Sequence, residues 1–260
     1  MAGLPELRVL ENLEEVAREA AEFFYESADE AIATRGLCRV ALSGGSTPKA
    51  LYEQLVRSPR SGRFPWAKMQ FYFGDERCVP PTHAESNFGL ADAALFRPLS
   101  LEAQGIFRMK GEAEDTEQAA RDYEALLLKQ FGVRPPAFPQ FDLLFLGLGD
   151  DAHIASLFPG TAALDERRRW VVPNQAPRGV PNRLTLTVPV LNQAEAVVFL
   201  VTGSGKAPAV RTVFDDPAAD ARQFPARLVR PEKGRLIWFA DRAAAAQLAM
   251  LSRGDSSHEE

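Results

Sequence analysis

Ionisable side chains that could carry out chemistry follow a nearly unbroken apolar run, FDLLFL, at residues 141–146. Two glycines end the run, and Asp150, Asp151 and His153 come next. An apolar run of this length is typical of a strand buried on both faces of a parallel sheet. Ligands of open α/β sheets bind at the carboxyl ends of such strands, so we expect a functional site here. A neutral histidine at that edge could take a proton from water.

A second group with chemical potential is a glycine-rich turn that directly follows the strand expected over residues 37–42. The turn consists of Ser43, Gly44, Gly45, Ser46 and Thr47. We expect Thr47 to be the N-cap of a helix, with Pro48 as the first helical residue. The free N–H groups of a helix start attract anions, and glycines let a phosphate approach the backbone. The same residues would also suit a well-capped turn that binds nothing.

A third group repeats the pattern of an apolar strand followed by glycine and charge. The strand expected over residues 69–73 is followed by Gly74 and then by Asp75, Glu76 and Arg77. Taken alone, these charges could simply solvate a loop. Two strands that end in the same way indicate a shared active-site edge. The next segment is rich in proline, so His83 is expected to be a surface residue.

The remaining periodicity predicts alternating helices and strands. Helices are expected over residues 11–34, 112–131, 206–214 and 241–250 and from about Ser86, and further strands over residues 105–109, 169–172, 183–188, 194–202 and 235–240. The chain has 260 residues, which suits one α/β domain. We expect that domain to span residues 1–252, with a polar tail at 253–260 that is too short to fold.

Composition excludes several classes of protein. The formal net charge of -5 argues against a nucleic-acid binder, which would concentrate Lys and Arg on one face. The amino-terminal sequence does not resemble a signal peptide, and no apolar run approaches the length of a membrane span, so we expect a cytoplasmic protein with no membrane partner. Cys38 and Cys78 lack CxxC spacing, which indicates neither a disulfide framework nor a zinc site.

Three motifs suggest other enzymes but do not fit them. Gly147, Gly149 and Ala152 match GxGxxG/A, yet two carboxylates would lie beside the pyrophosphate and Pro159 prevents a long helix. The GSGKA segment at residues 203–207 lacks both the first glycine of a P-loop and its Ser or Thr. No serine stands in a GxSxG frame, which disfavours a serine hydrolase.

Five blocks of sequence, in order, resemble one family. They read SGGSTPKALY, GDERCVP with ESNFGLA, GLGDDAHIASLFPG, RLTLTVP and VTGSGKA. In these blocks the chain is similar to the 6-phosphogluconolactonases, within the wider family that includes glucosamine-6-phosphate deaminase. The resemblance implies a Rossmann-like three-layer α/β/α sandwich around a mainly parallel sheet. It also implies hydrolysis of 6-phospho-D-glucono-1,5-lactone in the pentose phosphate pathway, with neither a metal nor an organic cofactor.

The resemblance also implies roles for individual residues. His153 is expected to be the general base, Asp151 its neighbour in the DxH pair, and Arg77 an active-site cation. The SGGST turn and Lys206 are expected to contact phosphate, with Arg183 as a further candidate. Additional pocket residues are expected to be Asp75, Glu76 and Asn87. We expect the enzyme to act as a monomer on a small sugar phosphate lactone.

Two departures from the family pattern leave alternatives open. The usual DGHT reads DAHI, and if that glycine has a positive φ, Ala152 would strain the turn beside His153. A regulatory module that binds sugar phosphate without turnover is therefore one alternative. Ile154 is shared with the deaminase branch, which is the other alternative. That branch has a glutamate a few residues later, however, where this chain has Ser156, Leu157 and Phe158.

Overall fold

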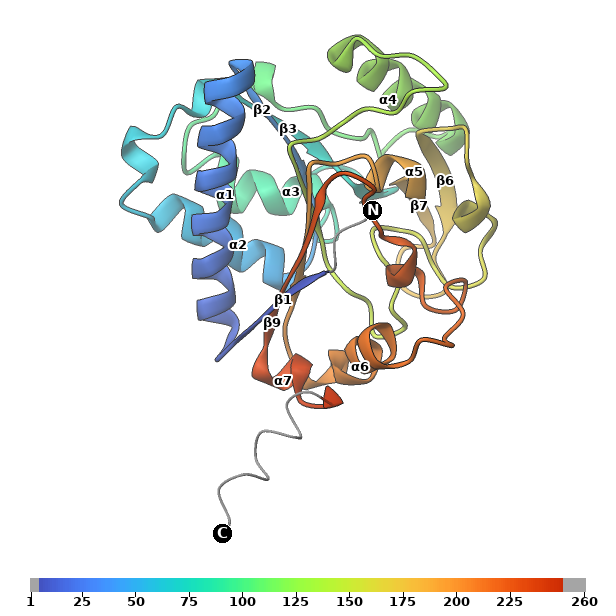
Figure 1. The fold of residues 1–260 in the computed structure, drawn as a ribbon. Coiled ribbons are helices and arrows are strands. Elements are labelled where there is room, and N and C mark those ends of the chain that lie inside the picture. Colours follow the sequence, from blue (N-terminus) through green and yellow to red (C-terminus); the bar gives the residue numbers. More distant parts are fainter. Residues whose placement is uncertain (1–4, 250–260) are drawn as a thin grey trace.

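The computed structural model describes residues 5–249, and its centre is a parallel sheet of six strands (Figure 1). The tail predicted at residues 253–260 lies outside this range. In spatial order the strands are β1 (Glu6–Leu10), β9 (Arg235–Asp241), β8 (Ala196–Val201), β5 (Leu143–Leu146), β2 (Cys38–Leu42) and β3 (Met69–Phe73). All five neighbouring pairs are parallel.

Helices cover both faces of this sheet, as Figure 1 shows. One face carries α1 (Leu13–Arg35), α2 (Ser46–Arg57) and α3 (Asn87–Ala91). The other carries α4 (Thr116–Phe131), α5 (Val188–Leu191), α6 (Ala207–Asp215) and a small antiparallel sheet with the order β4 (Asp75–Arg77), β7 (Asn182–Leu186), β6 (Val171–Gln175). The short α7 (Arg242–Ala245) follows β9. The predicted three-layer α/β/α architecture is confirmed.

The strand order reverses next to β5. The chain moves outward from β2 to β3, returns to place β5 on the other side of β2, and then continues outward through β8 to β9. The crevice at such a reversal, beside the carboxyl ends of the strands, is where doubly wound α/β proteins bind ligands. The turns that follow β2, β5 and β8 therefore lie at the position where a site is expected.

Local sequence explains the central strands and the longest helix. All residues of β5 and β8 are buried, which accounts for their continuous apolar sequences. Helix α1 buries its regularly spaced apolar face, and it begins at the N-cap Asn12, whose side chain accepts from the N–H of Glu15. It ends at Gly36, which has a φ of 80°. The predicted helix and strands are thus present at these positions.

Several predicted elements differ from the observed ones. The strand predicted over residues 105–109 makes only one bridge, between Phe71 and Ile106. Helix α7, within the helix predicted over residues 241–250, ends at Ala245. Strands β1 and β4 were not predicted, because β1 is half-buried along its whole length and β4 has only three residues. Within residues 5–249, no helix is long and apolar enough to cross a membrane.

Candidate active site

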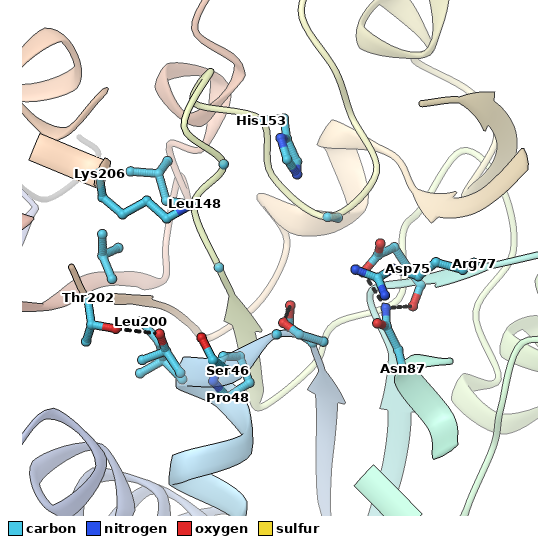
Figure 2. Close-up of a pocket in the computed structure, with 18 residues that line it drawn as sticks. Ser46, Pro48, Asp75, Arg77, Asn87, Leu148, His153, Leu200, Thr202 and Lys206 are labelled. Atoms are coloured by element: carbon cyan, nitrogen blue, oxygen red, sulfur yellow. Dashed lines mark hydrogen bonds between the residues drawn. The ribbon is translucent and has the colours of Figure 1, made fainter. Parts of the chain in front are cut away.

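The turns after β2, β5 and β8 enclose a cavity of about 240 Å³ at the carboxyl edge of the sheet (Figure 2). His153 and Lys206 line it on one side, the start of α2 lines it below, and Asp75, Arg77 and Asn87 line it on the other side. A second hollow of about 710 Å³ shares Asp75, Arg77 and His153 with the first. His153 therefore faces one continuous depression.

The best-defined chemical group in this depression is the pair formed by Asp151 and His153. Nδ1 of His153 lies 2.6 Å from Oδ1 of Asp151, which also accepts the backbone N–H of His153 at 3.1 Å. A carboxylate can only accept, so Nδ1 carries a proton, and in the neutral ring Nε2 keeps its lone pair. This is the tautomer that a general base needs.

The environment of Asp151 favours its ionised form. Partial burial by itself would raise the pKa of this carboxyl group. The hydrogen bond from the ring of His153 and the attraction of that ring when it is protonated outweigh this effect, so the pKa of Asp151 lies below its ordinary value. Asp151 is thus an anion that can orient the ring and stabilise it once it takes up a proton.

The turn that carries His153 contains the positive φ at residue 152 that was considered from the sequence. Ala152 is fully buried and has a φ of 60°, a region that costs a residue with a Cβ about 1–2 kcal/mol. Its N–H donates to the carbonyl of Gly149, and its own carbonyl accepts from the N–H of Ala226 at 3.0 Å. These bonds hold Ala152 in the strained conformation, so the replacement of glycine leaves the Asp151 to His153 contact intact.

Gly149 is required by the close approach of the same ring. A Cβ at this position would lie 2.0 Å from Nδ1 of His153 and 2.6 Å from Oδ1 of Asp151. The N–H of Gly149 donates to the carbonyl of His153 at 2.9 Å, which closes the turn. The glycine therefore makes room for the pair rather than for a nucleotide.

The SGGST turn has an open helix start. Helix α2 begins at Ser46, and its N-cap is Gly45, which has a φ of 109° and no capping side chain. The prediction that Thr47 is the N-cap was wrong, because Thr47 is the second helical residue and its hydroxyl instead lies 2.8 Å from that of Thr202. Because no side chain makes a capping hydrogen bond at Gly45, this end of α2 presents N–H groups and a partial positive charge to the cavity.

Lys206 reaches the same cavity from the turn after β8. Its Nζ lies 2.6 Å from Oδ1 of Asp150, whose side chain is largely exposed. Lys206 lines the cavity opposite the start of α2 (Figure 2). Lys206, which the resemblance suggests contacts phosphate, lines the cavity, and its pairing with Asp150 was not predicted.

The two predicted arginines are neighbours on the small antiparallel sheet. Arg77 of β4 lies directly opposite Arg183 of β7, and both line the second hollow together with Arg178. Burial lowers the pKa of Arg183, and the positive charge of Arg77 lowers it further. Two guanidinium groups side by side destabilise each other unless an anion lies between them. The second hollow is accordingly suited to an anionic group.

Glu76, predicted as a pocket residue, lies behind the pocket wall and lines neither hollow. It is almost fully buried and accepts from the backbone N–H groups of Arg77, Asn87 and Phe88 and from the hydroxyl of Ser86. Burial raises its pKa despite these four donors. Its position follows from the strand period, which turns Glu76 away from the face shared by Asp75 and Arg77.

Most of the other predicted residues line the cavity, together with residues that were not predicted. Ser43, Gly44, Asp75 and Asn87 line the cavity, with the side-chain N–H₂ of Asn87 donating to the backbone oxygen and Oδ1 of Asp75. Sequence reasoning missed Thr202 as well as Arg178. Thr202 directly follows a buried strand, a signal that could have found it, whereas Arg178 lies in a loop with no such signal. Within the described residues, no cluster of three or more potential metal ligands occurs.

Comparisons with known proteins agree with this geometry. Residues 11–238 match the model of the family described as glucosamine-6-phosphate isomerases/6-phosphogluconolactonase. The chain belongs to this family. The resemblance inferred from the five sequence blocks is therefore confirmed.

Individual members of the family are similar over nearly their whole length. A 6-phosphogluconolactonase from Synechocystis sp. is 42% identical over 244 residues, covering 94% of this chain and 98% of the relative. One from Nostoc sp. is 40% identical, covering 85% and 89%. The solved structure of 6-phosphogluconolactonase from Trypanosoma cruzi is 29% identical with a TM-score of 0.84, covering 96% of this chain and 98% of that one.

Proposed function

We propose that this protein hydrolyses 6-phospho-D-glucono-1,5-lactone to 6-phospho-D-gluconate, the second step of the oxidative pentose phosphate pathway. The observation that carries the proposal is the Asp151 to His153 pair, which faces a cavity lined by an open helix start and by the cations Arg77 and Lys206. The lactonases among its relatives support the choice of reaction within the family.

The reaction needs one base and no covalent nucleophile. Nε2 of His153 takes a proton from water while the water oxygen forms a bond to C1 of the lactone, and the carbonyl becomes an oxyanion. When the oxyanion collapses, the bond between C1 and the ring oxygen breaks, and the protonated His153 returns its proton to that oxygen. The product acid then ionises to a carboxylate. Asp151 stabilises the intermediate imidazolium.

The cations around the base complement the negative charges of the phosphate and of the developing oxyanion. The start of α2, with Ser43, Gly44, Gly45, Ser46 and Thr47, suits the phosphate, and Lys206 on the opposite wall of the cavity can reach the same group. Arg77 and Arg183 provide the remaining positive charge beside His153. A fixed cation beside C1 would stabilise the developing oxyanion, which is commonly worth about 2.7–4 kcal/mol.

The test is hydrolysis of freshly prepared lactone above its spontaneous rate. We expect the purified protein to accelerate acid release at catalytic concentration. No acceleration would overturn the proposal, and binding of 6-phosphogluconate without turnover would favour a regulatory module instead.

The deaminase alternative is tested by ammonium release from glucosamine-6-phosphate. We expect none, since Ser156, Leu157 and Phe158 occupy the stretch where that branch has its glutamate. Ser156 is fully buried, and its hydroxyl donates to Asp75, so it offers no substitute carboxylate.

A further inference from the structure

Ser156 connects the turn that carries His153 to every strand of the small antiparallel sheet. Its hydroxyl donates to Oδ2 of Asp75 in β4 at 2.6 Å, and its N–H donates to Oγ1 of Thr185 in β7 at 3.2 Å. Its carbonyl accepts from Nδ2 of Asn174 in β6 at 2.8 Å. The residue is 0% exposed, so all three bonds are shielded from water.

The partner of the Ser156 hydroxyl is a buried carboxylate that lies beside an arginine without pairing with it. Asp75 is only 5% exposed and shares one face of β4 with Arg77, since they are two residues apart. Figure 2 shows Asp75 and Arg77 adjacent, with Asn87 bonded to Asp75. A buried carboxylate beside a guanidinium would ordinarily pair with it. Instead, the side-chain donors to Asp75 are the hydroxyl of Ser156 and the amide of Asn87.

Among the residues that the structure describes, neither Arg77 nor Arg183 forms an ion pair with a carboxylate. Arg77 donates to the backbone oxygen of Glu85, and Arg183 donates to that of Val180. Among the described residues, Nε of Arg77 is a buried donor that has no hydrogen-bond partner. A buried donor without a partner costs about 1–3 kcal/mol, so Asp75 would gain by turning toward it if its oxygen were free.

We propose that Ser156 is a positioning residue that holds Asp75 away from Arg77 and thereby keeps Arg77 and Arg183 available for an anionic substrate. The inference rests on the proposed function and deepens it, because it explains how a pocket that contains a buried carboxylate can still bind a sugar phosphate. Loss of the hydroxyl would free Oδ2 of Asp75 to neutralise Arg77.

The experiment is a double-mutant cycle on ligand affinity with Ser156→Ala, Asp75→Asn and the combined variant. The dissociation constant of 6-phosphogluconate is measured by calorimetry, which needs no turnover. We expect Ser156→Ala to raise this constant about tenfold, in keeping with the loss of a hydrogen bond to a charged group. In the Asp75→Asn background, where no carboxylate can neutralise Arg77, we expect Ser156→Ala to change it less than about twofold.

Kinetics and a control variant separate this role from a general structural one. Ser156→Ala keeps the backbone bonds to Thr185 and Asn174, so we expect KM for the lactone to rise while kcat changes less than about threefold. Ser58→Ala removes another buried hydroxyl, whose oxygen accepts from the N–H of Arg60. This control variant should leave KM and kcat unchanged. Equal losses of affinity in both backgrounds of the cycle would overturn the proposal.

Two further measurements keep the test decisive. If Ser156→Ala does not fold, Ser156→Cys retains the size and a weaker donor, and its dissociation constant should lie between that of the wild type and tenfold above it. An unchanged or lower constant would contradict the inference. Inorganic phosphate serves as a second probe of the arginines, so the cycle can still be measured if the protein does not hydrolyse the lactone.

Discussion

At the scale of single residues, the contact between Asp151 and His153 determines what the pocket can do. It fixes the tautomer of the ring and leaves Nε2 as the free acceptor. Ala152, which replaces the glycine of the family motif, has a positive φ of 60° and does not displace the pair. The contact between Asp151 and His153 is therefore present despite this substitution.

Replacement of the base should abolish most turnover but not binding. We expect His153→Ala to lower kcat about 10²–10⁴-fold, the usual contribution of a positioned base. Calorimetry should find 6-phosphogluconate affinity within a few-fold of the wild type, since the cations lie on other residues. His83→Ala alters a histidine on an exposed loop and should keep full activity. Full activity in His153→Ala would remove His153 from the base role.

The lowered pKa of Asp151 predicts a pH dependence of stability. Because the pKa is lower in the folded than in the unfolded state, ionised Asp151 stabilises the fold above the unfolded pKa of about 3.9. This stabilisation is lost as pH falls through the folded-state pKa. Urea unfolding should show the wild type more stable than Asp151→Asn at neutral pH, with the difference shrinking below about pH 4. A difference that grows in acid would contradict this prediction.

Restoration of the family glycine should change stability little. Ala152→Gly relieves the positive φ, but it also removes a buried methyl group worth about 0.8 kcal/mol and adds freedom to the unfolded chain. We expect the free energy of unfolding to stay within about 1 kcal/mol of the wild type, with activity retained. Denaturant unfolding measures the free energy of unfolding, and the lactonase assay measures the activity. A loss above about 2 kcal/mol would mean that the methyl group is essential to packing.

At the scale of elements, the site depends on short turns at the ends of buried strands and on the small antiparallel sheet. Strand β4 has only three residues, yet it presents Asp75 and Arg77 to the pocket and turns Glu76 inward to hold the start of α3. The pairing of β4 with β7 places the two arginines together. The small sheet therefore supplies the two arginines, while turns after strands of the six-stranded sheet supply His153 and Lys206.

The turn after β5 should not tolerate a side chain at Gly149. In Gly149→Ala the new Cβ would meet the ring of His153, so the ring must move. We expect kcat to fall at least about tenfold and stability to fall by about 1–3 kcal/mol. Gly62→Ala is the matched control, because a Cβ at Gly62 meets nothing within 4 Å. Comparable activity in both variants would show that the ring position is not critical.

At the scale of the whole molecule, one hydrophobic core runs through the sheet and both helical layers. The three tryptophans lie in different parts of this core. Trp66 packs near Phe24 of α1, Trp170 lies beside β6, and Trp238 stacks on Phe199 at 3.7 Å between ring centroids. Contacts of this kind join all layers, which favours cooperative folding.

This continuity predicts a single unfolding transition, as expected of one domain. Far-UV circular dichroism and tryptophan fluorescence should give the same midpoint in urea, because helices and all three tryptophans lose their structure together. Two separated transitions would show that parts of the chain fold independently. Addition of 6-phosphogluconate at about 100 times its dissociation constant should stabilise the whole protein by about 2.7 kcal/mol.

The central strands, and the edge of the sheet at which the site would form, could be predicted from the amino-acid sequence alone. A strand buried on both faces must be continuously apolar, so β3, β5 and β8 were visible as runs, and the glycines and polar residues that follow them marked the carboxyl edge. His153, Lys206 and the SGGST turn could be placed for this reason. The family motifs then added their expected roles.

How residues far apart in the chain meet became visible only in the folded structure. Arg77 faces Arg183 because β4 pairs with β7, and Ser156 reaches Asp75 across 81 positions of sequence. Thr47 pairs with Thr202 instead of capping a helix, and Glu76 turns inward. Local sequence specifies periodicity and turns. Which face of a short polar strand is buried, however, depends on the strands and helices that another part of the chain packs against it.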